Sequence, residues 1–222
     1  MSKIGQADHT ERPYFGVMPT VEKVDLYKLH KNEYVTPKKP VLLDVQPAKY
    51  LSITGAGAPG SEEFQAKLGA LYGTAFTMKF DAKFAGCDYA VCKLEAIYWT
   101  DLGGPGFETI PMDQWHWDLI VRTPDFVTTA RLKAAQTKML GKGVPEAAKV
   151  VFQTIREGKC VQMLHVGPYS AERATIEQMC AFAKGEGYEF GDRHHEIYLS
   201  DPRRVPPEKL KTILRMPVHR LK

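Results

Sequence analysis

Two short motifs, each occurring twice and in the same order, constrain the fold of this chain most strongly. The pattern P-x-S-x-E occurs at residues 59–63 and 168–172, and the pattern I-Y-x-[TS]-D occurs at 97–101 and 197–201. Each P-x-S-x-E follows a short apolar run and opens a segment with helical periodicity, and each I-Y-x-[TS]-D closes a half of the chain. The sequence therefore predicts an internal duplication, although P-x-S-x-E is also ordinary helix-start chemistry that can recur without one.

The first half combines several predicted strands with one main helix. Apolar runs at 41–45 and 50–54 flank a turn-like QPAK segment and predict a β-hairpin. Ser61 is a suitable N-cap for the helix that follows, because two glutamates stand in its first turn. Residues 88–100 and 115–122 are predicted to be strands.

The second half repeats this pattern. Residues 128–140 predict a connecting helix, and residues 161–166 predict a strand. Residues 150–155 and those just before them fit a helix by their alanines or a strand by their β-branched run. The repeat places 150–155 opposite the first strand of the other half, and this favours the strand. An amphipathic helix at 170–184 and a last strand at 194–202 complete the half.

These elements predict an α+β fold made of two tandem modules, at about 41–122 and 123–202, related by a pseudo-twofold axis. Their antiparallel sheets would unite, with helices on one face and a ligand cleft on the other face near the junction. Residues 1–40 are predicted to form a tail and a short helix, for which Thr20 is the candidate N-cap. Residues 203–222 are predicted to form a helical tail that begins after two prolines.

The composition fits a globular protein and excludes several classes. The chain has 222 residues, of which 44% are hydrophobic and 25% are charged, so one or two domains could each bury a core. No apolar run is long enough to span a membrane, and the polar N-terminus lacks the core of a secretory signal. The net charge of +4 is scattered, which favours a solvated basic face over nucleic-acid binding. Four cysteines without a C-x-x-C pair indicate free thiols in the cytoplasm.

Glu196 is the strongest candidate for chemistry. In the alternating strand 194–202, Glu196 and Tyr198 face one side, whereas His195 and Ile197 face the other. A carboxylate among apolar neighbours could be desolvated and act as a general acid or base, or it could stay ionised and bind a cation beside aromatic rings. The simpler alternative is a glutamate that faces solvent on an open sheet.

Aromatic residues gather in the same predicted strands. They could be ordinary core, or they could line a flat cleft for a planar or lipophilic ligand. The repeat aligns Tyr98 with Tyr198 and so places both on the cleft face, whereas Trp99 and Glu95 then point away. Strand parity alone leaves the side of Trp99 open.

The sequence predicts neither a metal nor a cofactor. His165, His194 and His195 form no i, i+4 helical pair and no H-x-H strand pair. The glycine-rich loop at 55–60 lacks the lysine and the hydroxyl residue of a phosphate-binding P-loop. No serine stands in a G-x-S-x-G elbow, and no cysteine has a neighbouring histidine.

Two segments resemble the GyrI-like small-molecule-binding family. They are VQMLHVGPY at 161–169 and HEIYLSDPRR at 195–204, within a likeness that runs from about residue 41 to 214. The resemblance implies tandem strand–helix–strand–strand modules with a ligand cleft between them, which agrees with the repeat. It also implies an aromatic pocket for lipophilic, often cationic molecules, with Glu196 as its buried acid. The ligand-binding residues that we expect are Tyr98, Trp99, Trp115, His165, Tyr169 and Tyr198.

The family implies three kinds of activity. Some members are ligand sensors fused to DNA-binding domains, one branch antagonises DNA gyrase, and a stand-alone branch hydrolyses cyclopropane-bearing, DNA-alkylating compounds. Residues 1–40 are too short for a helix-turn-helix domain, which favours the stand-alone branch. We therefore expect a protective hydrolase in which Glu196 activates water. The alternatives are a drug-binding protein without turnover and a gyrase partner.

Overall fold

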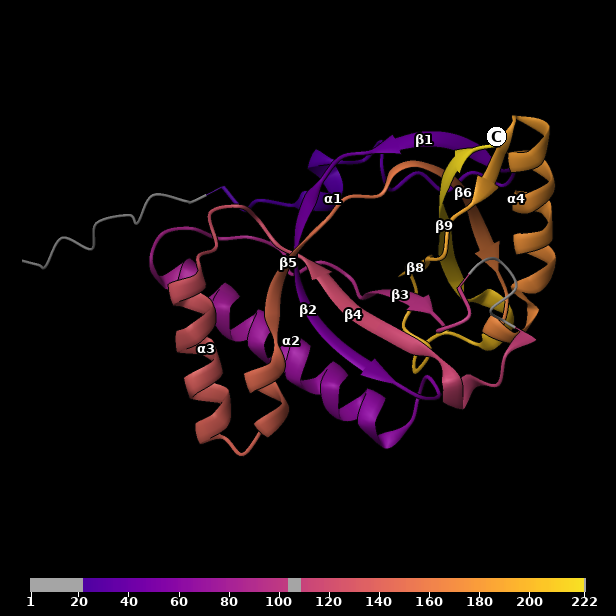
Figure 1. Ribbon diagram of the computed structural model, residues 1–222. Helices are drawn as coiled ribbons and strands as arrows, with labels where there is room; N and C mark the ends of the chain where they lie inside the picture. The colour runs from indigo at the N-terminus through magenta and orange to yellow at the C-terminus, as the bar shows by residue number, and fades with distance from the viewer. Residues whose placement is uncertain (1–21, 104–108, 222) are drawn as a thin grey trace, which may run out of the picture.

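The computed structural model of the protein describes residues 22–103 and 109–221 (Figure 1). A nine-stranded antiparallel sheet has the order β1-β6-β9-β8-β3-β4-β2-β5, with β7 paired to β9. The strands are β1 (Val41–Val45), β2 (Ala48–Ala56), β3 (Glu95–Trp99), β4 (His116–Arg122), β5 (Val151–Ile155), β6 (Gly158–Val166), β7 (Tyr188–Phe190), β8 (His194–Tyr198) and β9 (Lys211–Arg220). The α-helices are α1 (Leu26–Leu29), α2 (Glu62–Phe84), α3 (Thr129–Gly141) and α4 (Arg173–Gly185). The predicted α+β class is confirmed.

The strand order has the symmetry that the duplicated motifs predict. β1 corresponds to β5, β2 to β6, β3 to β8 and β4 to β9. When each strand is replaced by its counterpart, the same strand order results, read from the opposite edge of the sheet. Ala96 and Glu196, which occupy equivalent positions in the two copies, are cross-strand partners in the β3–β8 pair. A pseudo-twofold axis therefore passes between Ala96 and Glu196, and the internal duplication is confirmed.

The first strands of the two modules are exchanged, which corrects the predicted hairpin at 41–54. β1 pairs with β6 of the second module, and β5 pairs with β2 of the first. Only Gln46 and Pro47 separate β1 from β2. A two-residue hairpin turn needs a positive φ angle at its first residue, and in type I′ also at its second. Gln46 is no glycine and Pro47 has a fixed negative φ, so the chain bends there and continues into the other half of the sheet.

The C-terminal segment is a strand, and the predicted helical tail after the two prolines was wrong. A short 3-10 turn at Pro207–Lys209 leads into β9, which runs between β6 and β8. Residues 212–216 are all buried, because the sheet covers the backbone edges and side chains pack on both faces. Pairing on both sides thus overrides the helical spacing of Leu210 and Ile213. β9 is the equivalent of β4, and it completes the second module.

The other predicted elements agree with the structure except at their ends. Ser61 caps α2 by accepting a hydrogen bond from the amide of Phe64, and Thr128 caps α3 in the same way. The long strand predicted at 88–100 is confined to β3. The short helix near the N-terminus is α1, capped by Asp25, whereas the predicted cap Thr20 lies outside the described residues.

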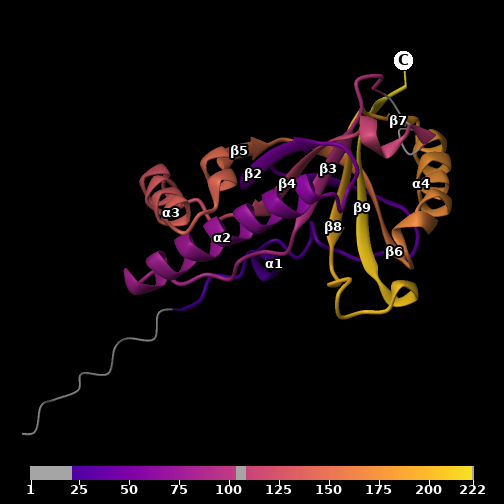
Figure 2. The same ribbon diagram turned by 90° about the horizontal axis from the view of Figure 1, so that it is seen from below.

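Helices α2 and α4 cover the same face of the sheet. On one side of the axis, Phe64 of α2 packs edge-on against Trp117 of β4, with ring centroids 5.0 Å apart. On the other side, Met179 of α4 packs in one apolar cluster with Leu214 of β9. Figure 2 shows α2 lying along β2 and β4 and α4 beside β6. The junction of the modules lies between these two helices.

Residues 22–37 cross the opposite face and bury polar groups there. The Glu33 carboxylate is 2.7 Å from the Arg122 guanidinium. The backbone carbonyl oxygen of Glu33 accepts hydrogen bonds from the side chains of Gln162 and Arg215. Tyr34 donates to the Glu95 carboxylate over 3.1 Å. This segment therefore joins residues from both modules across the face opposite α2 and α4.

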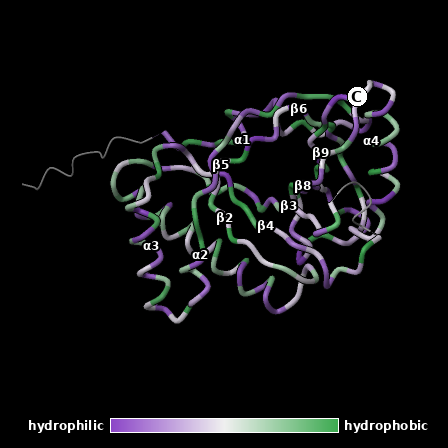
Figure 3. Tube along the Cα trace, viewed as in Figure 1, coloured by the Kyte–Doolittle hydropathy of each residue, from purple (hydrophilic) through white to green (hydrophobic). Residues whose placement is uncertain are grey.

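The apolar core divides into two main parts, one under each helix. The hydropathy trace shows apolar residues along the strands and mixed helix faces (Figure 3). The cluster under α2 includes Met78, Trp117 and Leu119, and the cluster under α4 includes Met163 and Met179. Within the described residues, no helix combines the length and apolar character that crossing a membrane requires.

The contact between Gly55 and Trp117 predicts a sharp difference between two glycines. A Cβ at Gly55 would stand 2.1 Å from the Trp117 ring, whereas one at Gly69, in α2, would meet nothing within 4 Å. We expect Gly55→Ala to lower the free energy of unfolding by about 1–3 kcal/mol through overpacking. Gly69→Ala, the matched control, should raise it by about 1 kcal/mol. Urea denaturation measures both, and equal effects would contradict the packing argument.

Candidate functional site

Glu196 lies at the pseudo-twofold axis on the helical face of the sheet. Its cross-strand partners are Ala96 on one side and Leu214 on the other, and partners in register share a face. Leu214 packs against α4, so the Glu196 side chain points into the space between α2 and α4. The face opposite α2 and α4, where we expected the cleft, is covered by residues 22–37, which include α1. Glu196 is only 7% exposed, so a solvent-facing glutamate is excluded.

Tyr98 and Tyr198 meet across the axis, as their alignment in the repeat predicts. Their hydroxyl oxygens are 2.8 Å apart. Burial, followed by the nearby Glu196 carboxylate, raises the pKa of both phenols well above the usual value. Both therefore stay neutral and remain hydrogen-bond donors. Tyr198 also hydrogen-bonds Glu196, so a chain of donors runs from Tyr98 through Tyr198 to the carboxylate.

His194 holds the Glu196 carboxylate from the same strand. Its Nε2 atom is 3.1 Å from Oε1 of Glu196, and its Nδ1 atom is 3.1 Å from Sδ of Met216. An ionised carboxylate can only accept, so the proton on Nε2 is directed at Glu196. The two residues stand two apart on β8, and strand periodicity places them on one face.

Glu172 completes the polar cluster and was missed by sequence reasoning. It is the N-cap residue of α4 and is buried. One carboxylate oxygen each of Glu172 and Glu196 and one ring nitrogen of His194 all lie within 4.8 Å of one another. Burial, then the Glu196 charge and a hydrogen bond with Glu196, raise the pKa of Glu172 well above its usual value. The sequence shows Glu172 as the last residue of the second P-x-S-x-E motif, but that motif indicates only a duplication and a helix start, and not a buried acid.

Aromatic rings border the cluster on two sides. Trp115 packs edge-on against Tyr98, and Tyr169 packs edge-on against Tyr198, each with ring centroids 5.7 Å apart. Trp115 donates from Nε1 to the carbonyl oxygen of Ile110, which fixes its ring. Tyr169 is 40% exposed, so it forms the solvent side of the cluster.

Two predicted ligand-binding residues are not brought into this cluster. Trp99 lies on the other face of β3, where it stacks on His116 and carries the Arg193 guanidinium 3.9 Å from its ring centroid. Both ring nitrogens of His165 form hydrogen bonds outside the cluster: Nδ1 is 2.9 Å from the Thr175 hydroxyl, and Nε2 is 3.2 Å from the Pro168 carbonyl oxygen. His165 therefore holds the turn that carries Tyr169 and Glu172.

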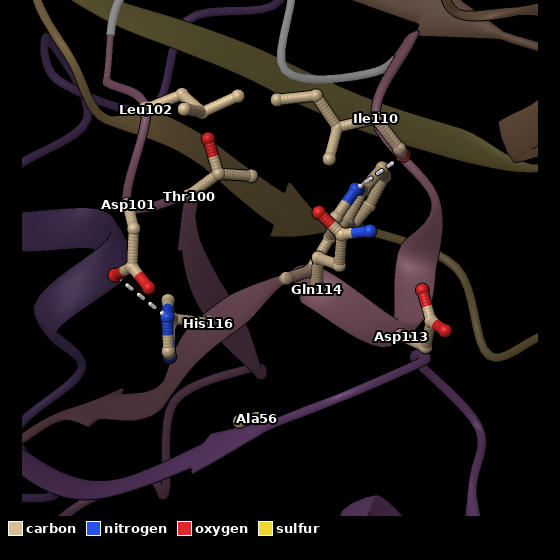
Figure 4. Close-up of a pocket in the computed structure, with 9 residues that line it drawn as sticks. Ala56, Thr100, Asp101, Leu102, Ile110, Asp113, Gln114 and His116 are labelled. Carbon is tan, nitrogen blue, oxygen red and sulfur yellow. Dashed lines mark hydrogen bonds and ion pairs between the residues drawn. The ribbon is translucent and has the colours of Figure 1, made fainter.

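A cavity of about 310 Å³ opens at the rim of the sheet beside Trp115 (Figure 4). His116 and Asp101 close one side of it with an ion pair of 3.0 Å between Nε2 and Oδ1. Trp115 thus borders both this cavity and the Tyr98 ring. The remaining lining residues are Ala56, Thr100, Leu102, Ile110, Asp113 and Gln114.

The polar cluster has the composition of a cation site, but a proton satisfies the same geometry. Two carboxylates and an imidazole are groups that divalent cations accept. A proton on Glu172 removes one negative charge and provides a donor toward Glu196, so the three side chains need no cation to coexist. The absence of a metal stays a prediction.

A second buried ionic network lies on the opposite face of β8. His195 is 3.0 Å from Glu95 and 2.8 Å from Glu157, and Glu157 is 3.0 Å from Arg215. Burial would lower the pKa of His195, but the two carboxylates outweigh it and raise the pKa to about 9. Burial would raise the pKa of Glu157, but His195 and Arg215 lower it to about 2. This network supports the strand that carries Glu196.

The network predicts how stability depends on pH. His195 has its raised pKa of about 9 in the folded protein against an ordinary value of 6.5, so its stabilisation is complete below about pH 6.5 and is lost as the pH rises to 9. The Glu157 carboxylate stabilises the folded protein fully above about pH 4.5, and this stabilisation is lost as the pH falls toward 2. We expect the free energy of unfolding to be highest between these limits. Urea denaturation across pH tests this, and in His195→Gln the fall on the alkaline side should be smaller than in wild type, whereas the part contributed by Glu172, whose pKa is also raised, should remain.

Comparisons with known proteins agree with this fold. The GyrI-like small molecule binding domain profile matches residues 125–219. An uncharacterized conserved protein from Listeria innocua shares 38% identity over 89% of this chain and 100% of its own length, with a TM-score of 0.82. This chain belongs to the GyrI-like family. A hydrolase from the same organism, encoded by lin2189, shares 37% identity over the same fractions, with a TM-score of 0.80.

A more distant structure shows how widely the GyrI-like fold is shared. The EcmrR C-terminal domain has a TM-score of 0.53 and 13% identity, over 82% of this chain and 98% of that domain. At that identity the likeness concerns the fold alone. No curated protein matches the chain.

Proposed function

We propose that this GyrI-like protein binds a planar, lipophilic molecule against the Glu196 cluster and hydrolyses it, and that its substrates are cyclopropane-bearing, DNA-alkylating compounds. The observation that carries the proposal is one buried carboxylate at the module junction, held by His194 and Tyr198 beside aromatic rings. The hydrolase name of the Listeria innocua protein that is 37% identical to this chain supports a hydrolytic role. In the cell, ring opening would destroy the alkylating group and protect DNA.

Glu196 would act as the general base. It takes a proton from water while the water oxygen forms a bond to the least hindered carbon of the strained ring. One ring carbon–carbon bond breaks, and its electron pair moves into the conjugated acceptor of the substrate. The acceptor then takes up the proton that Glu196 received, so the protein ends unchanged. Trp115 and Tyr169 would hold the planar part of the substrate in place.

A second candidate function is the binding of a lipophilic cation without turnover. Two acidic side chains, Glu172 and Glu196, lie beside the exposed ring of Tyr169, and this combination attracts an organic cation by charge and by cation–π contact. In this function Glu196 would only pair with the positive charge.

Mass spectrometry in ¹⁸O-labelled water distinguishes the two functions. We expect a cyclopropane-bearing alkylating compound to gain one labelled water in the presence of the protein, faster than in buffer alone. A planar quaternary ammonium dye serves as the binding probe for the alternative. Dye binding without any labelled product would favour the binding function and exclude the hydrolase.

A further inference from the structure

The polar cluster contains two glutamates that come from different elements. Glu196 stands in the middle of β8, whereas Glu172 stands at the start of α4, and their carboxyl oxygens lie within 4.8 Å. The two side chains are 7% and 6% exposed. Two ionised carboxylates at this separation, away from water, repel each other strongly. The cluster is therefore stable only when something neutralises one of the charges.

We propose that Glu172 carries a proton, donates it in a hydrogen bond to Glu196, and thereby positions the Glu196 carboxylate toward the substrate. Glu172 is a positioning residue in this arrangement, because it acts through Glu196. The inference rests on the proposed function for its catalytic meaning, but the shared proton is a property of the free protein.

The surroundings of Glu172 favour a proton on this residue rather than on Glu196. Glu196 already receives hydrogen bonds from His194 and Tyr198, which stabilise its ionised form. The Oε1 atom of Glu172 has no hydrogen-bond partner among the described residues. The raised pKa of Glu172 has burial as its first cause and the Glu196 charge as its second. The pair is thus asymmetric, with an acid on α4 and a base on β8.

The other groups around the pair do not replace this proton. Tyr98, Tyr169 and Tyr198 have pKa values raised by burial and by Glu196, so all three stay neutral. Met216 faces the far nitrogen of His194 and carries no charge. With the proton on Glu172, the two carboxyl groups would therefore hold one negative charge between them, located on the carboxylate that faces the substrate.

The first module provides a natural control for this role. Glu63 occupies the position of Glu172 in the first P-x-S-x-E motif, but it forms an ion pair with Lys67 at 2.6 Å and its side chain is 54% exposed. The residue facing the axis there is Ala96 instead of a glutamate. Only the second module therefore combines a buried helix-start acid with a carboxylate on the sheet.

Infrared difference spectroscopy of the free protein tests the shared proton without any substrate. A protonated carboxylic acid absorbs at a different frequency from a carboxylate. We expect the wild type at pH 7 to show one protonated-carboxyl signal that is absent from Glu172→Gln. Glu63→Gln should keep that signal. An unchanged signal in Glu172→Gln would overturn the proposal, as would a stoichiometric divalent metal found by elemental analysis of the active protein.

The pH dependence of hydrolysis tests the positioning role. Glutamine keeps a donor, so Glu172→Gln should stay within about tenfold of wild-type kcat/KM at pH 7, whereas Glu172→Val should lose about 100-fold through misplacement of Glu196. In wild type, activity should fall at alkaline pH when Glu172 loses its proton, and this fall should be absent in Glu172→Gln. The same alkaline fall in both proteins would contradict the role. Should hydrolysis itself be absent, the infrared result still decides whether the proton is shared.

Discussion

Glu196→Gln is expected to abolish ring opening while ligand binding is retained. Glutamine has the size of glutamate and can accept a hydrogen bond from His194 through its carbonyl oxygen, but it cannot take a proton from water. Loss of a general base costs about 10²–10⁴-fold in rate. We expect kcat to fall by this factor, and the dissociation constant of the unreacted compound to change by less than about tenfold.

The measurement combines turnover followed by mass spectrometry with binding followed by calorimetry. Glu208→Gln is the matched control, because Glu208 is an exposed glutamate in the turn before β9, and it should behave as wild type. Ring opening at the wild-type rate in Glu196→Gln would sink the general-base mechanism. Loss of binding as well would assign Glu196 to ligand recognition.

Arg215→Met is expected to be the most destabilising single substitution among those considered. Arg215 is fully buried in β9, where it bonds Glu157 and Gln162 at 3.0 and 2.8 Å and also the carbonyl oxygen of Glu33. Methionine fills similar space, but it removes one of the two cations that face Glu157, because only His195 remains. It also leaves Oε1 of Gln162 without this donor and the Glu33 carbonyl oxygen with Gln162 alone. Removing one partner of a buried ion pair costs about 3–5 kcal/mol.

Chemical denaturation of matched variants would isolate this effect. Arg173→Met removes an exposed ion pair with Glu177, so it should change the free energy of unfolding by less than about 0.5 kcal/mol. Adding Glu157→Gln to Arg215→Met removes the uncompensated charge and should recover part of the loss. Equal stability of Arg215→Met and Arg173→Met would show that the network contributes nothing.

The part of the fold that sequence reasoning predicted depends on local signals that the chain repeats. Caps such as Ser61 and Thr128, and the two I-Y-x-[TS]-D motifs, mark the ends of elements whatever their tertiary partners are. The alignment of Tyr98 with Tyr198 also placed both phenols on one face, because strand periodicity and the repeat give the same answer. The hydrogen bond between them follows from the axis that relates them.

The features that were missed depend on contacts between distant segments. Nothing local shows that β1 pairs with β6, although Pro47 excludes a tight hairpin turn. The helical spacing of Leu210, just before β9, and Ile213, within it, is equally compatible with a strand buried on both faces. Tertiary pairing decided both cases.

The candidate site was only half visible for the same reason. Glu196 stood out because a carboxylate in an apolar strand is unusual, whereas Glu172 looked like an ordinary acidic residue at a helix start. The network of His195, Glu157 and Arg215 joins two strands, β8 and β9, to the connection between β5 and β6, and it leaves no sequence pattern. Trp99 could not be assigned to a face until its partner His116 was known.

The position of Glu196 on the pseudo-twofold axis limits which ligands the site can favour. A symmetric dimer of two second modules would place two copies of this glutamate opposite each other, with Cα atoms about 5 Å apart, and their charges would repel. Joining the modules in one chain allows alanine at position 96, so one carboxylate remains and a small apolar side chain stands opposite it. A ligand bound there meets a charged half and an apolar half. Under the proposed function, the duplicated scaffold would favour molecules whose two ends differ.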